Sequence, residues 1–379
     1  MLVVSRELPP VGGGAGRVAL DLAEELAARG HRVDLVTMGF RDLPLREERG
    51  GLVVHRVACG RASADHSTPA EMWRFRALAR PLLARLLAER PPAIVHAHGI
   101  VPDGWIAEGA SRSSSGKPAL VITAHGSDVP GFNPDRFQLW HALARPLLLR
   151  TLQRAMVVCA PSSFLAGLIR RARPQQEVAV VPNGVRSHLF PSPAPPGERE
   201  GFLLCGRLER RKRFPLFLAA LESIEAPQVV DVIGEGEDRA ALERRATPSR
   251  HRIVLHGRLE SGSPAWRDLF AKRRFFVLPS ARENFPVSLL EAQLGGLLVL
   301  ASSIPGCREA AGDDAIYFAG LEPHAIAATI REALALKPQA IATRVARARR
   351  RVVEELSVAR MADRYLGLYV EAVARGSRP

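Results

Sequence analysis

Short apolar runs alternate with longer amphipathic segments along the whole chain. The apolar runs predict strands, and the segments with apolar residues at three- and four-residue spacing predict helices. Because strands separated by helices need crossover connections, the pattern predicts mostly parallel sheets. In the first half, the predicted strands cover 2–5, 32–37, 53–57, 94–98, 120–123, 155–159 and 178–181, and the predicted helices cover 18–29, 73–90, 136–154 and 163–171.

A proline-rich stretch at 191–200 interrupts this alternation and is the best candidate for a linker. Beyond it the pattern restarts, so we predict a domain over 1–190, a second over 191–355 and a C-terminal helix over 356–379. Two doubly wound α/β domains should bind ligands at the carboxyl ends of their strands, in the cleft between them. In the second half, the predicted strands cover 202–206, 228–233, 252–256, 275–279 and 297–302, and the predicted helices cover 215–222, 239–245, 265–271, 287–294, 323–336 and a long region over 339–374.

The composition is that of a globular protein, with 47% hydrophobic and 24% charged residues. Neither an apolar run long enough to cross a membrane nor a signal peptide is apparent, so we expect a cytoplasmic protein. The four cysteines lie far apart, which argues against a disulfide framework and a clustered-thiolate metal site.

The net charge of +14 favours anionic partners. However, only four of the 53 basic residues are lysines, and this skew is typical of GC-rich codon usage. No nucleic-acid-binding motif accompanies the charge, so we do not expect nucleic acid as a partner.

A glycine cluster, Gly12, Gly13 and Gly14, lies between the first predicted strand and the first predicted helix. Residues 14–19 match the G-x-G-x-x-A dinucleotide fingerprint, and Asp34 follows at a suitable distance. The long turn after Pro9 and Pro10, and the position of Asp34 inside its strand, argue against a dinucleotide site. We therefore interpret the cluster as a glycine loop that approaches a ligand at a helix N-terminus. An ordinary connecting loop is the alternative.

Histidines end two of the predicted strands. His96 and His98 share one face, and without a third ligand we interpret them as hydrogen-bonded structural residues. His125 follows the strand at 120–123 and should face the cleft, which favours a functional role over a structural one. Asp128 is equally suited to function and to capping the next turn.

A basic segment at 207–213 follows the first predicted strand of the second half. Arg207 could bind two oxygens of a diphosphate, and Lys212 could add a point charge. A solvated basic turn is an equally good interpretation of this segment.

Two glutamates follow the buried strand at 275–279. Glu283 lies in the loop, and Glu291 lies in the helix that Pro286 begins. A carboxylate among apolar neighbours needs a partner, and sugar hydroxyls are suitable. A helix-capping glutamate and a solvated one are the alternative.

These glutamates have the E-x7-E spacing of retaining GT-B glycosyltransferases, and the chain resembles glycosyltransferase family 4, the "glycosyl transferases group 1". The resemblance spans nearly the whole chain. It is carried in order by segments 9–13, 30–33, 95–98, 123–128, 181–185, 206–212, 233–236, 256–258 and 279–291.

The resemblance implies a GT-B fold, in which two Rossmann-like domains face each other across a cleft, and a C-terminal helix that returns to the first domain. It implies transfer of a sugar from a UDP-, GDP- or ADP-sugar to an unidentified acceptor, without a metal or other cofactor. The implied donor site lies in the second domain, and the first domain supplies the acceptor side. The implied roles are diphosphate binding by Arg207 and Lys212, ribose binding by Glu291, sugar and phosphate binding by Glu283, Asn284, Phe285 and Pro286, contact with the base by Gly257 and Arg258, approach to the donor sugar by His125, and closure beside the phosphates by Gly12, Gly13 and Gly14.

Several positions depart from the family pattern and leave the donor open, among them Arg213 and Arg186. The alternatives are another GT-B enzyme, such as a nucleotide-sugar epimerase, and a non-catalytic nucleotide-sugar-binding protein.

The basic helix at 73–90 carries Leu78, Leu82 and Leu86 at helical spacing. We interpret this stripe as core-facing, with peripheral contact with an anionic membrane as the alternative.

Overall fold

The computed structural model describes residues 1–190 and 198–376, which form two compact units. The first unit comprises Met1–Gly184 together with the helix that begins at Val358, and the second unit comprises Val185–Ser357. The chain therefore changes unit a few residues before the predicted boundary at 190. Most of the predicted linker, residues 191–197, lies outside the described residues.

The first unit is built on an eight-stranded sheet with the order β3-β4-β2-β1-β5-β6-β7-β8. All neighbouring strands are parallel except the hairpin of β3 and β4. The strands are β1 (Leu2–Val4), β2 (Val33–Phe40), β3 (Arg46–Arg49), β4 (Leu52–Arg61), β5 (Ile94–His98), β6 (Ala119–Thr123), β7 (Val157–Ala160) and β8 (Ala179–Val180). The helices are α1 (Gly14–Ala28), α2 (Pro69–Glu89), α3 (Trp105–Arg112), α4 (Pro134–Arg154), α5 (Ser163–Ala172) and α13 (Val358–Gly376).

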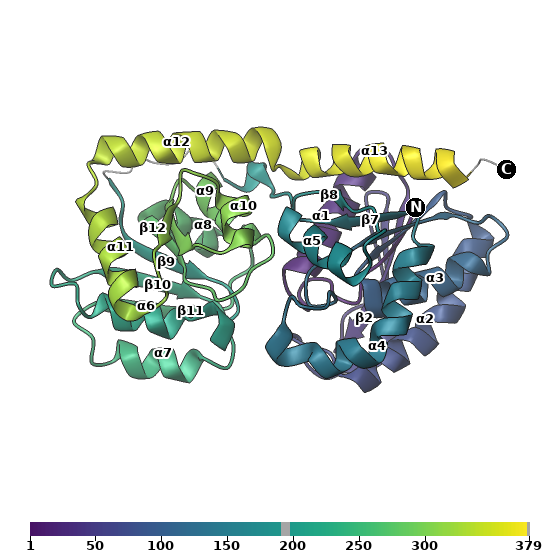
Figure 1. The fold of residues 1–379 in the computed structure, drawn as a ribbon, viewed down its shortest axis with the longest axis horizontal. Helices are drawn as coiled ribbons and strands as arrows, with labels where there is room; N and C mark the ends of the chain where they lie inside the picture. The colour runs from purple at the N-terminus through teal and green to yellow at the C-terminus, as the bar shows by residue number, and fades with distance from the viewer. Residues whose placement is uncertain (191–197, 377–379) are drawn as a thin grey trace. The chain divides into compact units, whose positions relative to one another are not determined.

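The last helix, α13, docks on the first unit's sheet beside α1 (Figure 1). Two tyrosines of α13 reach buried polar groups of the sheet. The Tyr369 hydroxyl lies 2.7 Å from His96 Nδ1, and the Tyr365 hydroxyl lies 2.9 Å from Thr123 Oγ1. These polar contacts pair groups that burial would otherwise leave unsatisfied, so they fix where α13 packs.

The second unit is built on a six-stranded parallel sheet with the order β11-β10-β9-β12-β13-β14. Its strands are β9 (Glu200–Cys205), β10 (Val229–Ile233), β11 (Arg252–Gly257), β12 (Arg273–Leu278), β13 (Leu298–Ser302) and β14 (Ile316–Phe318). Its helices are α6 (Phe214–Leu221), α7 (Arg239–Ala246), α8 (Pro264–Lys272), α9 (Val287–Leu294), α10 (Pro305–Ala311), α11 (Pro323–Ala335) and α12 (Pro338–Glu355).

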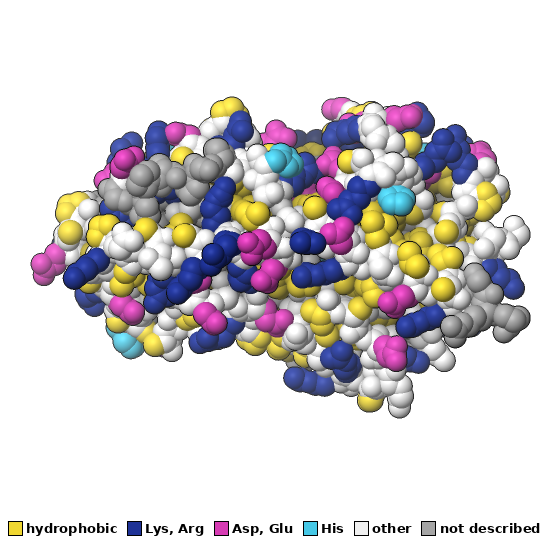
Figure 2. Space-filling view, turned by 90° about the horizontal axis from the view of Figure 1, so that it is seen from above, with side chains coloured by type: hydrophobic (Ala, Val, Ile, Leu, Met, Phe, Trp, Pro, Cys, Tyr) yellow, Lys and Arg dark blue, Asp and Glu magenta, His cyan; other side chains and the backbone are white. Residues whose placement is uncertain are grey.

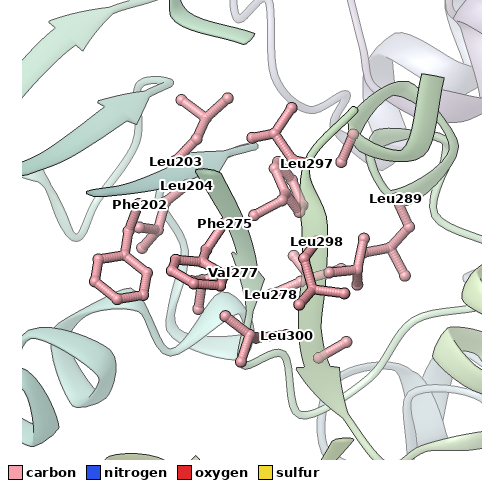
Figure 3. Packing of buried hydrophobic residues seen from close by; sticks show 14 of the residues in the cluster. Phe202, Leu203, Leu204, Phe275, Val277, Leu278, Leu289, Leu297, Leu298 and Leu300 are labelled. Carbon is pink, nitrogen blue, oxygen red and sulfur yellow. The ribbon is translucent and has the colours of Figure 1, made fainter. Parts of the chain in front are cut away.

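The core of the second unit is formed by the central strands, where Phe202 on β9 stacks on Phe275 on β12 (Figure 3). Leucines of β13 and Leu289 of α9 pack against these strands. The near-continuous apolar character of β9, β12 and β13 is typical of parallel strands covered on both faces. The sheet therefore gives a rigid frame for the loops at its edges.

Several elements differ from the sequence-based expectations. The polar hairpin strand β3, the short helices α3 and α10, and the final strand β14 were not predicted, because each is short or lacks a clear apolar period. The helix expected at 18–29 begins earlier, at Gly14. The single helical region expected over 339–374 is two helices, which break at Leu356 and Ser357.

The buried face of α2 also differs from the expected one. Leu78 is half exposed and Leu82 only partly buried, whereas Phe75, Ala79 and Leu83 face the core. The expected stripe is therefore wrong at Leu78 but is confirmed at Leu86, which is buried in the core, and Leu82 packs against that core. Among the described helices, none combines the length and the apolar character needed to cross a bilayer.

Candidate active site

The order of the second unit's sheet defines one place where a ligand should bind. The chain leaves β9 towards β10 on one side, and it later returns to β12 on the other side of β9. Ligands of doubly wound sheets bind at such a switch point, beyond the carboxyl ends of the strands. The residues that follow β9 and β12 are the basic segment with Arg207 and Lys212, and the loop with Glu283.

The structure brings Lys212 and Glu283 into direct contact. Lys212 Nζ lies 2.5 Å from Glu283 Oε1, and each side chain is only 12% exposed. The backbone holds the two loops together, because the amide of Ala281 donates to the carbonyl of Arg211 at 2.7 Å. A partly buried cation and carboxylate at the switch point form the charged centre of the candidate site.

Glycines allow the carboxyl ends of β9, β10 and β11 to meet closely. Gly234 has a φ of +145°, and a Cβ placed there would lie 1.9 Å from the carbonyl oxygen of Gly206. The amide of Gly234 donates to the carbonyl of Gly257 at 2.8 Å. Only glycine fits such a backbone contact. The glycine at position 234 therefore allows the loop that begins at Gly206 to lie directly against it.

Arg207 lies in that loop. Its guanidinium is half-buried and has no hydrogen-bond or ion-pair partner among the residues that the structure describes. The side chain of Lys212 packs against Gly206, which is the residue immediately before Arg207. The two cations that the sequence singled out therefore flank the same glycine, and Arg207 keeps its full capacity for a bidentate oxygen ligand.

Glu291 lies in the second turn of α9 and accepts a hydrogen bond from Ser261 Oγ at 3.0 Å. Ser261 follows β11 and was not singled out in the sequence, because a lone serine in a loop gives no signal. At the end of β9, burial and the charge of Glu291 raise the pKa of the Cys205 thiol to about 12. The carboxylate is therefore positioned on the same sheet edge as Arg207.

The loop between Glu283 and α9 packs tightly against the start of α10. A Cβ at Gly306 would lie 2.2 Å from the carbonyl oxygen of Glu283 and 2.3 Å from that of Asn284. Asn284 is buried and Phe285 belongs to the core, so Phe285 presents its ring to the protein interior. Pro286 precedes the first helical residue instead of occupying it. These residues shape the backbone of the loop.

The predicted base-side residues differ in exposure. Gly257 ends β11 with a φ of +72° and is fixed by the hydrogen bond from Gly234, whereas Arg258 is exposed. Next to them, His256 Nε2 lies 2.7 Å from Asp231 Oδ1, and Arg273 also pairs with Asp231. Burial and the charge of Glu283 raise the pKa of Cys307, so neither Cys307 nor Cys205 is a thiolate at neutral pH.

The first unit has its own switch point, between β1 and β5. The carboxyl ends of β1, β5 and β6 place Glu7, His98 and His125 at one edge. Burial sets the pKa of His125, and the charges of Asp128, Arg6 and Glu7 at the same edge act on it in addition. Arg6 and Glu7 were missed in the sequence because they lie in the loop after a very short strand.

The glycine loop is fastened to this edge through Glu7. Glu7 Oε2 accepts the amide of Gly13 at 3.1 Å, and the amide of Gly12 donates to the carbonyl of Ala64 at 2.6 Å. Gly12 has a φ of +87°, and a Cβ there would overlap the Glu7 side chain at 2.5 Å. Gly14 is already the first residue of α1, so the loop leads directly into the positive end of a 15-residue helix.

His125 is held by His98, whose Nδ1 lies 3.1 Å from His125 Nε2 with the two rings stacked. Burial lowers the pKa of His125 to about 4, so the ring is neutral at pH 7. His98 Nε2 is buried and has no hydrogen-bond partner within the described part of the chain. The sequence analysis predicted that both histidines are fully hydrogen-bonded. This prediction holds for His96, whose two ring nitrogens are both paired, but not for His98.

Asp128 has a structural role in this edge. Its carboxylate accepts the amides of His125 at 3.1 Å, Gly126 at 2.9 Å and Ile100 at 2.8 Å. The alternative of a turn cap therefore fits the geometry. Within the described residues, no group of three histidines, cysteines or carboxylates is arranged to hold a metal ion.

Two family models together match most of the chain. "Glycosyltransferase Family 4" matches residues 12–189, and "Glycosyl transferases group 1" matches residues 199–336. The chain belongs to glycosyltransferase family 4. It is therefore a glycosyltransferase, as its sequence motifs predicted.

Relatives and solved structures agree with this family. A 2-deoxystreptamine N-acetyl-D-glucosaminyltransferase of Streptomyces fradiae is 28% identical over 339 residues, which cover 81% of this chain and 78% of that protein. The solved structure of a sucrose-phosphate synthase from Thermosynechococcus elongatus matches with a TM-score of 0.83 at 20% identity, over 99% of both chains. An Anabaena protein, HepE, solved in complex with UDP, matches with a TM-score of 0.76 at 18% identity, over 98% of this chain and 99% of that one. The predicted GT-B fold is confirmed.

The overall charge does not gather into one basic surface on the face that Figure 2 shows. Arginine and lysine side chains there are scattered among acidic and apolar ones. This distribution differs from the continuous basic face of nucleic-acid-binding proteins.

Proposed function

We propose that this family 4 glycosyltransferase uses a UDP-sugar and transfers its sugar with retention of the anomeric configuration. The observation that carries the proposal is the Lys212–Glu283 contact at the β9/β12 switch point, with the unpaired guanidinium of Arg207 beside it. The choice of UDP is supported by the Anabaena neighbour, which was solved with this nucleotide.

Arg207 and Lys212 bind the diphosphate in this proposal. A lysine ammonium carries three donors, and Glu283 accepts from one of them, which leaves donors for phosphate oxygens. As the bond between sugar and diphosphate breaks, negative charge grows on the leaving phosphate. Fixed cations stabilise that charge more strongly in the transition state than in the bound donor, so they promote turnover.

The carboxylates serve the sugar and the ribose. Glu291 accepts hydrogen bonds from the ribose hydroxyls, and the hydrogen bond from Ser261 orients its carboxylate. Glu283 and the backbone of the loop 284–286 bind the sugar and its phosphate, and Glu283 stabilises the positive charge that develops at the anomeric carbon. Gly257 and Arg258 lie on the base side.

Retention follows in this proposal from departure and attack on the same face of the sugar. The acceptor hydroxyl attacks the anomeric carbon while the bond between that carbon and the diphosphate oxygen breaks on the same face. The hydroxyl proton passes to the departing phosphate oxygen, so Glu283 forms no covalent bond. On the first unit, the neutral ring of His125 and the loop Gly12–Gly14 serve the donor sugar and the acceptor, with His98 and Glu7 as their positioning residues.

Hydrolysis of the donor in the absence of an acceptor tests the proposal without knowledge of the acceptor. UDP-glucose, UDP-N-acetylglucosamine, GDP-mannose and ADP-glucose should be compared, and NMR of the released or transferred sugar gives its first-formed anomer. Lys212→Ala should lower the rate at saturating donor by roughly a hundredfold or more. The matched control is Lys272→Ala, which removes an exposed lysine from α8. Equal rates for both variants, or a first-formed sugar of inverted configuration, would contradict the proposal.

A further inference from the structure

The outer face of α4 exposes large apolar side chains close together. Leu139 is 75% exposed, Leu143 is 72% exposed, and Trp140 between them is 39% exposed. Single exposed leucines are ordinary, but two leucines and a tryptophan within little more than one helical turn form a local apolar patch. We call these three residues the α4 patch.

The patch does not result from a helix that lacks a buried side. Further along α4, Leu148 and Leu152 are buried in the core, and His141 Nε2 lies 3.1 Å from the carbonyl oxygen of Ser127. The helix is therefore anchored by its inner side. The α4 patch faces solvent in the folded first unit and needs an explanation other than packing.

Neighbouring helices continue the apolar character. On α2, Trp73 is 55% exposed, and its ring meets the edge of Trp105 on α3 with centroids 5.4 Å apart. The guanidinium of Arg76 lies 4.0 Å from the centre of the Trp105 ring. Since α3 packs against both α2 and α4, and Figure 1 shows the three helices on one side of the unit, these aromatic residues belong to the same surface.

The charge of this surface is positive. Among the residues whose side chains the structure describes, the helices α2, α3 and α4 carry eight arginines, at positions 74, 76, 80, 85, 112, 145, 150 and 154, and four acidic residues, at 71, 89, 108 and 135. Glu71 and Glu108 are buried, which leaves Glu89 and Asp135 as the exposed acidic residues of these helices within the described part of the chain. Arginines on the rim of an apolar patch favour an anionic partner with an apolar interior.

We propose that α2, α3 and α4 dock the first unit onto the surface of an anionic phospholipid bilayer. The leucines of the α4 patch insert among the acyl chains, Trp73 and Trp140 lie at the headgroup level, and the arginines contact lipid phosphates. A second copy of the chain fits less well, because a symmetric contact would bring the same arginines together. The proposal is independent of the donor site, which lies in the second unit.

Flotation with lipid vesicles tests the proposal on the purified full chain without nucleotide. Vesicles of phosphatidylcholine alone should be compared with vesicles that contain equal parts of phosphatidylcholine and phosphatidylglycerol. We expect binding to the anionic vesicles alone, and we expect raised salt to weaken it. The double variant Leu139→Ser/Leu143→Ser should bind at least about tenfold more weakly. Arg80→Gln/Arg145→Gln should weaken binding while leaving the apolar patch unchanged.

The matched control is Val370→Ser on α13, which removes an apolar side chain that is 70% exposed on another part of the same unit. It should bind like the unchanged protein. A far-ultraviolet circular dichroism spectrum and a cooperative thermal transition like those of the unchanged protein would show that the variants are folded. Absence of binding to anionic vesicles, or equal binding by all variants, overturns the proposal. Self-association that the leucine variant abolishes, without vesicle binding, would assign the patch to a second copy and would also overturn it.

Discussion

Lys212 and Glu283 neutralise each other at the carboxyl edge of the second unit's sheet, and Arg207 beside them keeps an unpaired guanidinium. A diphosphate would therefore meet one cation that is free and another that is shared with a carboxylate. This difference predicts separate effects on removal of each side chain. Loss of Arg207 removes only the hydrogen bonds that it would make to the donor. Loss of Lys212 also leaves Glu283 as an uncompensated, partly buried charge.

Replacement of Arg207 by alanine should lower turnover at saturating donor, by roughly tenfold to a hundredfold. The reason is that the negative charge of the leaving diphosphate increases in the transition state. Initial rates over a range of donor concentrations separate turnover from the Michaelis constant. Arg258→Ala, at the exposed base side, should affect mainly the Michaelis constant. A pure Michaelis-constant effect for Arg207→Ala would mean that it only anchors the donor.

Buried histidines predict how the first unit responds to acid. Burial lowers the pKa of His96 to about 3, well below its value in an unfolded chain. The unfolded chain therefore binds more protons between those two values, and the stability contributed above pH 6.5 is lost as the pH falls towards 3. One such histidine lowers the free energy of unfolding by up to about 1.4 kcal/mol per pH unit in this window.

Chemical denaturation at a series of pH values checks this expectation. His96→Gln should show a shallower pH dependence than the unchanged protein, whatever its absolute stability. His324→Gln, on the exposed surface of α11, should leave the slope unchanged. Identical slopes for all three proteins would show that protonation of His96 does not couple to unfolding.

Among the elements, the turns that follow β9 and β10 come into close backbone contact at Gly206 and Gly234. Gly234→Ala should destabilise the second unit by about 2 kcal/mol or more, because the added Cβ overlaps the Gly206 carbonyl and the φ is unfavourable. The control is Gly367→Ala, which lies exposed in α13 with open space around it. That change should stabilise the helix by about 0.5–1 kcal/mol. Thermal unfolding of both variants gives the comparison, and an unperturbed Gly234→Ala protein would show that the contact between the two turns can relax.

The sequence predicted the central strands because they are continuous apolar runs, and most helices because their apolar residues recur at three- and four-residue spacing. It missed α3 and α10, which have only eight and seven residues and so show no clear apolar period. It also placed Leu78 of α2 in the core, since Leu78 and Phe75 both fit a helical period and only packing selects Phe75. Element boundaries and faces therefore depended on tertiary contacts.

The candidate site could be predicted where it repeats a family motif. Lys212 and Glu283 lie 71 positions apart in sequence and in contact in space. Glu7, His98 and Ser261 carry no such motif, and their positions became apparent only when strand order placed them at the sheet edges. The two units thus concentrate their polar groups at the switch points of their sheets, as doubly wound folds do.

For the whole molecule, the central claim is that the β9/β12 edge of the second unit binds a nucleotide-sugar donor. Thermal unfolding with and without UDP-sugars measures this directly, on the unchanged protein, on Glu291→Ala and on Glu332→Ala, which removes an exposed glutamate of α11. With donor at about a hundredfold excess over its dissociation constant, the unchanged protein and Glu332→Ala should gain about 2.7 kcal/mol. Glu291→Ala should lose most of this gain, because a hydrogen bond to a charged group is worth about 1.5–3 kcal/mol. Equal stabilisation of all three proteins, or none by any nucleotide sugar, would contradict the account.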